Sequence, residues 1–128
     1  MRAMILIFLG SGIGGLLRFV LGSLIYSYTG RKFPYGTLFI NVTGSLIIGF
    51  GFVIVTEKFT NFAPYLISFL LVGILGGYTT FATFSLETLR LFQDGKIAYA
   101  LLNLLSNTVL SVLLTWIGYI AARKLLGV

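Results

Sequence analysis

The residues best suited to ion chemistry lie in the third hydrophobic stretch, where residues 76–85 read Gly-Gly-Tyr-Thr-Thr-Phe-Ala-Thr-Phe-Ser. A glycine pair followed by β-branched threonines makes a poor continuous helix. We therefore predict a break near Gly76–Thr80, which would free backbone groups that lipid cannot satisfy. Unwound carbonyls of this kind coordinate sodium in transporters. A kinked helix whose threonine hydroxyls cap the freed groups explains the pattern equally well.

Two phenylalanines and a polar stripe follow the predicted break. Phe81 and Phe84 are three residues apart and share one helix face, where packing is their ordinary role. The edge of an aromatic ring is electropositive, so two edges lining a narrow path could also coordinate a small anion. Thr80, Thr83 and Glu87 form a neighbouring stripe that would serve as a polar wall or as a packing seam.

Polar side chains recur in the other hydrophobic stretches. Asn103, Asn107, Ser111 and Thr115 are spaced by four in the last stretch, and Asn41 lies in the second. Polar groups at membrane depth face protein or a water-filled path. The row therefore predicts either a polar track along one helix face or a set of interhelical hydrogen bonds.

Arg18 is the one charge deep in a hydrophobic stretch that is not near an end. An arginine at the bilayer centre costs about 2.5–3.5 kcal/mol on insertion scales. It therefore needs a partner, a water-filled vestibule or an anion, unless it lies close enough to an interface to extend its guanidinium into the headgroups.

The composition excludes most enzyme chemistry. Of the 128 residues 58% are hydrophobic and 9% charged, with no cysteine and no histidine. The acids are limited to Glu57, Glu87 and Asp94, too few for paired-carboxylate or metal-cage catalysis. The formal charge of +6 forms no nucleic-acid patch, because the bases lie at the ends of hydrophobic stretches as in membrane proteins. We expect a protein that is not an enzyme.

Four hydrophobic stretches must position these residues. Each is long enough to cross about 30 Å of hydrocarbon as a helix of roughly 20 residues. They cover residues 3–28, 35–56, 64–91 and 97–122. We predict an all-α membrane protein, with residues 1–128 forming a single four-helix domain. The first stretch is too long for a signal peptide and contains Arg18, so we expect it to be retained.

The basic residues are divided evenly between the two sides of such a bundle. One side would carry Arg2, Lys58, Arg123 and Lys124, and the other Arg31, Lys32, Arg90 and Lys96. Orientation follows from a difference between the sides, and here there is none. We predict that the chain inserts both ways and forms a dual-topology antiparallel homodimer. A single dominant loop base would instead fix one topology.

The chain resembles the Fluc (CrcB) family of fluoride channels over its whole length. The resemblance rests on Gly-Gly-Leu-Leu-Arg-Phe at 14–19, Gly-Thr-Leu-Phe-Ile-Asn at 36–41, and the run 76–85 followed by Glu87. It implies a channel for passive efflux of cytoplasmic fluoride, and so fluoride resistance, in the plasma (inner) membrane of a prokaryote. It also implies two antiparallel pores per homodimer and a central structural sodium ion that is not transported.

The resemblance assigns roles to individual residues. It implies that the carbonyls of Gly76 and Thr79 hold the sodium ion. It also implies a fluoride pathway formed by Arg18, Asn41, Phe81, Thr83, Phe84, Asn107 and Ser111. Two positions depart from the family pattern, because many members carry tyrosine at Asn103 and some carry serine or threonine at Ala82.

Two other functions fit four short helices. A small multidrug-resistance exporter would need a membrane-embedded acid in its first helix, where this chain has Arg18. A non-conducting accessory subunit would use the same polar residues for packing alone, and it would give no ion flux.

Overall fold

The computed structural model describes residues 1–128, and all of its regular structure is helical. Helix α1 (Arg2–Thr29), helix α2 (Tyr35–Val53) and helix α6 (Ile97–Leu126) are continuous, whereas the third span is interrupted. Four helical spans are long and apolar enough to cross a membrane. The prediction of an all-helical, multi-pass membrane protein is therefore confirmed.

The third span, Thr60–Gln93, consists of several short helical pieces. In chain order these are a 3₁₀ turn (Thr60–Phe62), α3 (Ala63–Leu66), the π-helix η3 (Ile67–Leu75), α4 (Gly76–Tyr78) and α5 (Phe81–Gln93). Thr79 and Thr80 between α4 and α5 have extended backbones, with ψ values of 157° and 111°. The helix therefore breaks within the predicted segment, while Gly76 and Gly77 themselves stay helical.

Glycines allow α1 to lie against the part of the third span that precedes the break. The buried residues of α1 are Gly10, Gly14 and Gly22. A Cβ on Gly10 would overlap the backbone of Phe69, and one on Gly14 would overlap the backbone of Ile74. In lipid, such small residues let helix backbones approach and gain dispersion contacts.

A Gly14→Ala substitution is expected to destabilise the fold by about 1–3 kcal/mol, because the added methyl must push two backbones apart. Gly12→Ala on the same helix is the matched control, since nothing lies within 4 Å of its added Cβ. Thermal unfolding in detergent should show a lower melting temperature for Gly14→Ala alone. Equal melting temperatures would contradict this packing.

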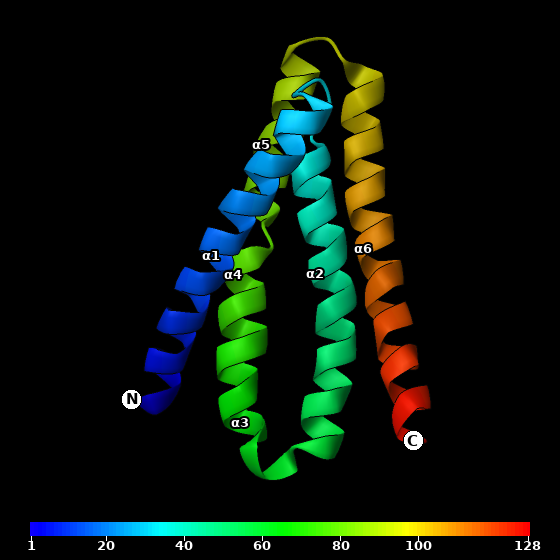
Figure 1. Ribbon diagram of the computed structural model, residues 1–128. Helices are drawn as coiled ribbons and strands as arrows, with labels where there is room; N and C mark the ends of the chain where they lie inside the picture. Colours follow the sequence, from blue (N-terminus) through cyan, green and yellow to red (C-terminus); the bar gives the residue numbers. More distant parts are fainter.

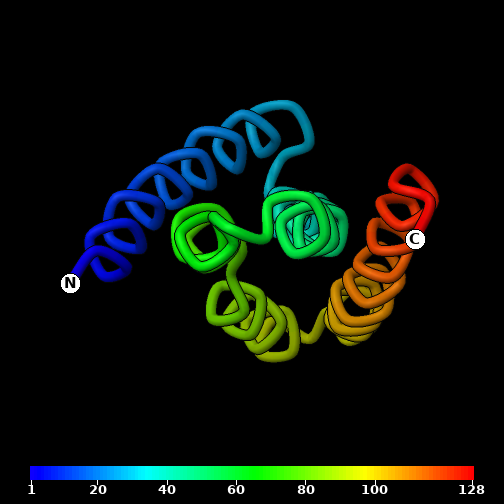
Figure 2. Tube along the Cα trace, turned by 90° about the horizontal axis from the view of Figure 1, so that it is seen from below, coloured from blue at the N-terminus to red at the C-terminus, as the bar shows by residue number.

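The spans alternate in direction (Figure 1). Both termini and the turn between the second and third spans lie at one end, and the other two loops lie at the opposite end. Figure 2 shows α2 near the middle, flanked by the third span and by α6. Helices α2 and α6 run in the same direction and touch where Gly49 meets the backbone of Thr115.

All four spans end later than the hydropathy pattern predicted, by one to four residues. Helix α2 continues as a π-helix over Ile54–Lys58, and α6 extends past Ala122 to Leu126. At the end of α6, Gly127 adopts φ 71°, the left-handed conformation that commonly ends helices. Arg123 and Lys124 lie in its last turn, where positive charge favours the helix C-terminus.

Candidate functional site

The break in the third span is held by the side chain of Asn41 on α2. Its Oδ1 accepts the Thr80 N–H at 2.9 Å, and its Nδ2 donates to the Thr80 carbonyl at 3.2 Å. One amide thus satisfies both backbone polar groups of an extended residue, as a low-dielectric environment requires. The Thr80 hydroxyl in turn accepts the Thr83 N–H at 3.2 Å and caps α5.

A chain of hydrogen bonds runs from Asn41 back to the third span. Asn41 Nδ2 donates to Asn107 Oδ1 at 2.9 Å, and Asn107 Nδ2 donates to Asn103 Oδ1 at 2.8 Å. Asn103 Nδ2 then donates to the Thr88 hydroxyl at 2.9 Å, which donates to the Phe84 carbonyl at 2.8 Å. We call Asn41, Asn107, Asn103 and Thr88 the asparagine relay.

The direction of the asparagine relay is fixed at both ends by the backbone. The Thr80 N–H can only donate and the Phe84 carbonyl can only accept, so each amide between them has one orientation that satisfies its neighbours. Asn103 is fully buried within this relay. The asparagines of the polar row therefore form interhelical hydrogen bonds between α2, α6 and α5.

A cavity of about 350 Å³ opens beside the relay, between α2, α6 and the break. It brings together most of the residues that the sequence singled out. Those on its wall are Asn41, Thr79, Phe81, Phe84, Asn107 and Ser111. Its remaining lining includes Ser45, Thr108 and the aliphatic side chains of Ile48 and Val112. The cavity is thus mainly apolar with a few hydroxyl and amide groups.

The two phenylalanines of this cavity contact one another edge to face. Their ring centroids are 5.4 Å apart and their planes are inclined by 64°. Phe84 is 6% exposed, whereas Phe81 is 79% exposed on the surface of the single chain. Phe81 therefore presents most of its ring to whatever surrounds the protein.

A second cavity, of about 340 Å³, lies on the α1 side of the break and contains Arg18, Thr83 and Glu87. The Arg18 guanidinium donates from Nη1 to the Thr79 carbonyl at 3.3 Å. Arg18 thus has a partner in a carbonyl that the break exposes. The stripe formed by Thr80, Thr83 and Glu87 lines this cavity, while Thr80 also caps α5.

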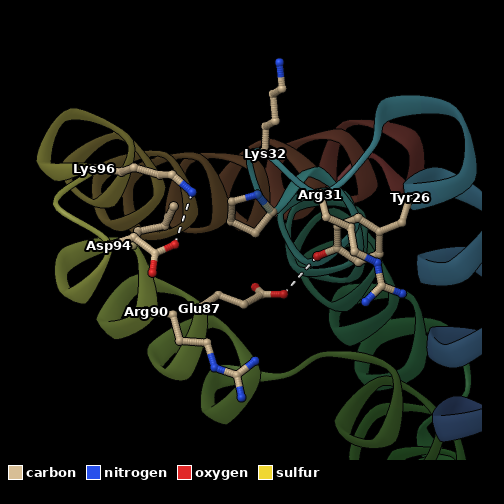
Figure 3. Close-up of a pocket in the computed structure, with 9 residues that line it drawn as sticks. Tyr26, Arg31, Lys32, Glu87, Arg90, Asp94 and Lys96 are labelled. Carbon is tan, nitrogen blue, oxygen red and sulfur yellow. Dashed lines mark hydrogen bonds and ion pairs between the residues drawn. The ribbon is translucent and has the colours of Figure 1, made fainter.

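Glu87 is hydrogen-bonded to side chains of the first two helices, and Figure 3 shows its bond to Tyr26 on α1. The hydroxyls of Tyr26 and Thr37 each donate to its Oε1 at 2.9 Å, and its buried Oε2 has no partner. Beside it, a cavity of about 240 Å³ at the loop end is lined by four bases. These are Arg31, Lys32, Arg90 and Lys96, of which Lys96 pairs with Asp94 at 3.1 Å.

Residues 5–119 match the family described as CrcB-like protein, Camphor Resistance (CrcB). The chain belongs to this CrcB family. Similar proteins named fluoride-specific ion channel FluC occur in Methylococcus capsulatus, with 48% identity over 117 residues, and in Coxiella burnetii (strain CbuK_Q154), with 42% over 121 residues. The alignments cover 91% and 94% of this chain. The chain spans about half (51%) of the Methylococcus protein and 98% of the Coxiella one.

Another FluC channel, from Magnetococcus marinus, is 45% identical over 115 residues, covering 90% of this chain and 93% of that protein. The names of these CrcB relatives describe ion channels and not enzymes, which agrees with the expectation from the composition.

In this CrcB-family chain, sequence reasoning missed the partners of Glu87 and the polar wall residues Ser45 and Thr108. Thr37 stood inside the segment 36–41 as an unexplained hydroxyl, and Tyr26 gave no signal of its own. Ser45 follows Asn41 by four residues as Ser111 follows Asn107, a repeat that pointed to one shared helix face.

Proposed function

We propose that this protein is a fluoride-selective ion channel that gives passive efflux of cytoplasmic fluoride and so fluoride resistance. The observation that carries the proposal is the cavity at the helix break. There the rings of Phe81 and Phe84, the two relay residues Asn41 and Asn107, and a few hydroxyls surround a mainly apolar space. The relatives in the CrcB family that carry the name of fluoride channels support the same function.

Selectivity would follow from a narrow, dry path with sparse donors. Electropositive ring edges and hydroxyls suit a small hard anion that has lost its water. The asparagine relay would keep these groups in place, because each of its members is committed to a partner.

The driving force would be the membrane potential. Moving one charge through 100 mV is worth about 2.3 kcal/mol, which corresponds to roughly a fifty-fold ratio of concentrations. A potential that is negative inside therefore expels an anion without any other energy source. Arg18 and the bases of the loop-end cavity, Arg31 and Arg90, would raise the local anion concentration at the entrance.

A structural sodium ion would bind at the break. Because the Thr80 N–H turns to Asn41, the Gly76 carbonyl loses its helical donor, and Gly76 lies on the surface of the single chain. The Thr79 carbonyl already accepts a bond from Arg18 and would bind the ion through its other lone pair. Carbonyl oxygens are suitable sodium ligands, and the ion would neutralise their partial negative charges. A second antiparallel copy would supply the remaining ligands.

The working unit would be a dual-topology antiparallel homodimer with two pores, in the plasma membrane of a prokaryote. The equal division of bases and the exposed ring of Phe81 support this assembly. Single cysteines placed at Lys32, in the loop between α1 and α2, and at Lys58, at the end of the second span, should each be labelled by an impermeant thiol reagent from both sides of the membrane. Labelling of each from one side only would contradict it.

Fluoride efflux from liposomes tests the proposed function. Vesicles loaded with potassium fluoride should release fluoride to an external electrode when valinomycin lets potassium follow, whereas vesicles loaded with potassium chloride should retain chloride. A lack of fluoride release, or equal chloride release, would reject a selective fluoride channel.

A further inference from the structure

Ser45 and Ser111 occupy matching positions on two helices that run in the same direction. The Asn41–Asn107 hydrogen bond joins α2 and α6 at an offset of 66 residues, and the close approach of Gly49 to Thr115 has the same offset. Ser45 and Ser111 share that offset and fall midway between these two contacts, one helical turn from each. Both line the cavity beside the phenylalanines.

These two serines have the uncommitted hydroxyls of the cavity wall. Both amide hydrogens of Asn41 and both of Asn107 are already donated within the protein. The other three hydroxyls of the wall are committed: that of Thr79 donates to the Leu75 carbonyl at 2.9 Å, that of Thr80 to the Thr83 hydroxyl at 3.0 Å, and that of Thr108 to the Leu104 carbonyl at 2.8 Å. The hydroxyls of Ser45 and Ser111 make no such bond, although the same back-bonding geometry is open to any helical serine.

We propose that Ser45 is a further anion-contacting residue, and that its hydroxyl and that of Ser111 converge on one dehydrated fluoride ion. The inference rests on the proposed function and adds to it a donor on α2. An uncommitted hydroxyl can turn its hydrogen toward an anion without breaking an existing bond, whereas the cavity asparagines would first have to release a partner. The asparagines therefore act as positioning residues. The serines, one helical turn further along α2 and α6, act as donors to the anion.

The test compares fluoride efflux from liposomes containing the wild type, Ser45→Ala, Ser111→Ala and the double variant. The loss of one hydrogen bond to an ion weakens its binding by about tenfold or more. We therefore expect each single variant to slow efflux about tenfold. If both hydroxyls bind one ion, the double variant should be slowed less than the product of the single effects. The control is Ser106→Ala on α6, whose hydroxyl donates to the Leu102 carbonyl at 2.6 Å and lies outside the cavity lining.

Conservative replacements separate a donor role from packing. Ser45→Thr keeps the hydroxyl and should retain most of the flux, and Ser45→Cys, a weaker donor of similar size, should fall between serine and alanine. Efflux of Ser45→Ala at the rate of Ser106→Ala would overturn the inference, as would equal losses for threonine and alanine. In both cases the proposed function stands as long as the wild-type protein itself releases fluoride. A wild-type protein that releases no fluoride would reject the proposed function.

Discussion

Asn41→Leu is expected to abolish fluoride efflux and to lower folding stability by about 3–5 kcal/mol. Leucine has a similar size but makes no hydrogen bonds. The Thr80 N–H, the Thr80 carbonyl and Asn107 Oδ1 would each lose the bond that they make with Asn41. Each unpaired buried group costs about 1–3 kcal/mol. The break would lose its anchor to α2, and the groups of the cavity wall would lose their positions.

Asn41→Asp separates the anchor from the relay. Aspartate keeps an acceptor for the Thr80 N–H but removes the donors to Asn107 and to the Thr80 carbonyl, so the relay loses its first link and the anchor keeps one of its two bonds. We expect this variant to fold better than Asn41→Leu and still to lose most of the flux.

Thermal unfolding in detergent, monitored by gel filtration of the protein that remains folded, would measure these stabilities. Efflux from liposomes would measure the function. Ser106→Ala is the control, because the hydroxyl that it removes bonds to the backbone carbonyls of Leu102 and Asn103 and to no side chain of the asparagine relay. Wild-type stability and efflux in Asn41→Leu would contradict the role assigned to the relay.

Phe81→Ile is expected to slow fluoride efflux at least about tenfold while leaving folding stability nearly unchanged. The isoleucine keeps an apolar surface but removes the electropositive ring edge, whose interactions are worth about 0.5–1.5 kcal/mol each. If the ion meets the edge of this ring at several points along its path, the substitution removes more than one of these interactions. Because Phe81 is 79% exposed, little packing within the chain is lost.

Phe8→Ile is a closely matched control for Phe81→Ile. Phe8 lies on α1, is 78% exposed and lines neither of the two cavities at the break. Phe84→Ile should also reduce efflux, but Phe84 is 6% exposed, so its effect mixes ion contact with lost packing. Equal efflux from the Phe8 and Phe81 variants would remove the exposed ring from the mechanism.

The spans and the break were predictable because the bilayer leaves few choices. A run of about 20 apolar residues must be helical, since lipid cannot satisfy an open backbone. The same rule explains the break, because glycines and threonines weaken a helix and a polar side chain must then replace the lost bonds. Asn41 was visible as such a polar residue, although not as the partner of Thr80.

The partners within the site were not predictable, because helix register is lost in the third span. Helix α5 is rotated about the span axis relative to the start of the third span. The rotation comes from the π-helix Ile67–Leu75 and from the extended residues Thr79 and Thr80. Spacing alone therefore could not place Glu87 beside Tyr26. Nor could it show that Asn103 joins Asn107 to Thr88, since that bond depends on how α5 faces α6.

The most direct test of a fluoride-selective channel is the reversal potential of its current across a planar bilayer. With a tenfold fluoride gradient and equal chloride on both sides, the current should reverse near the fluoride equilibrium potential, about 59 mV in magnitude. With a tenfold chloride gradient and equal fluoride, it should reverse at zero. Reversal at zero under the fluoride gradient, or reversal that follows chloride, would contradict the account.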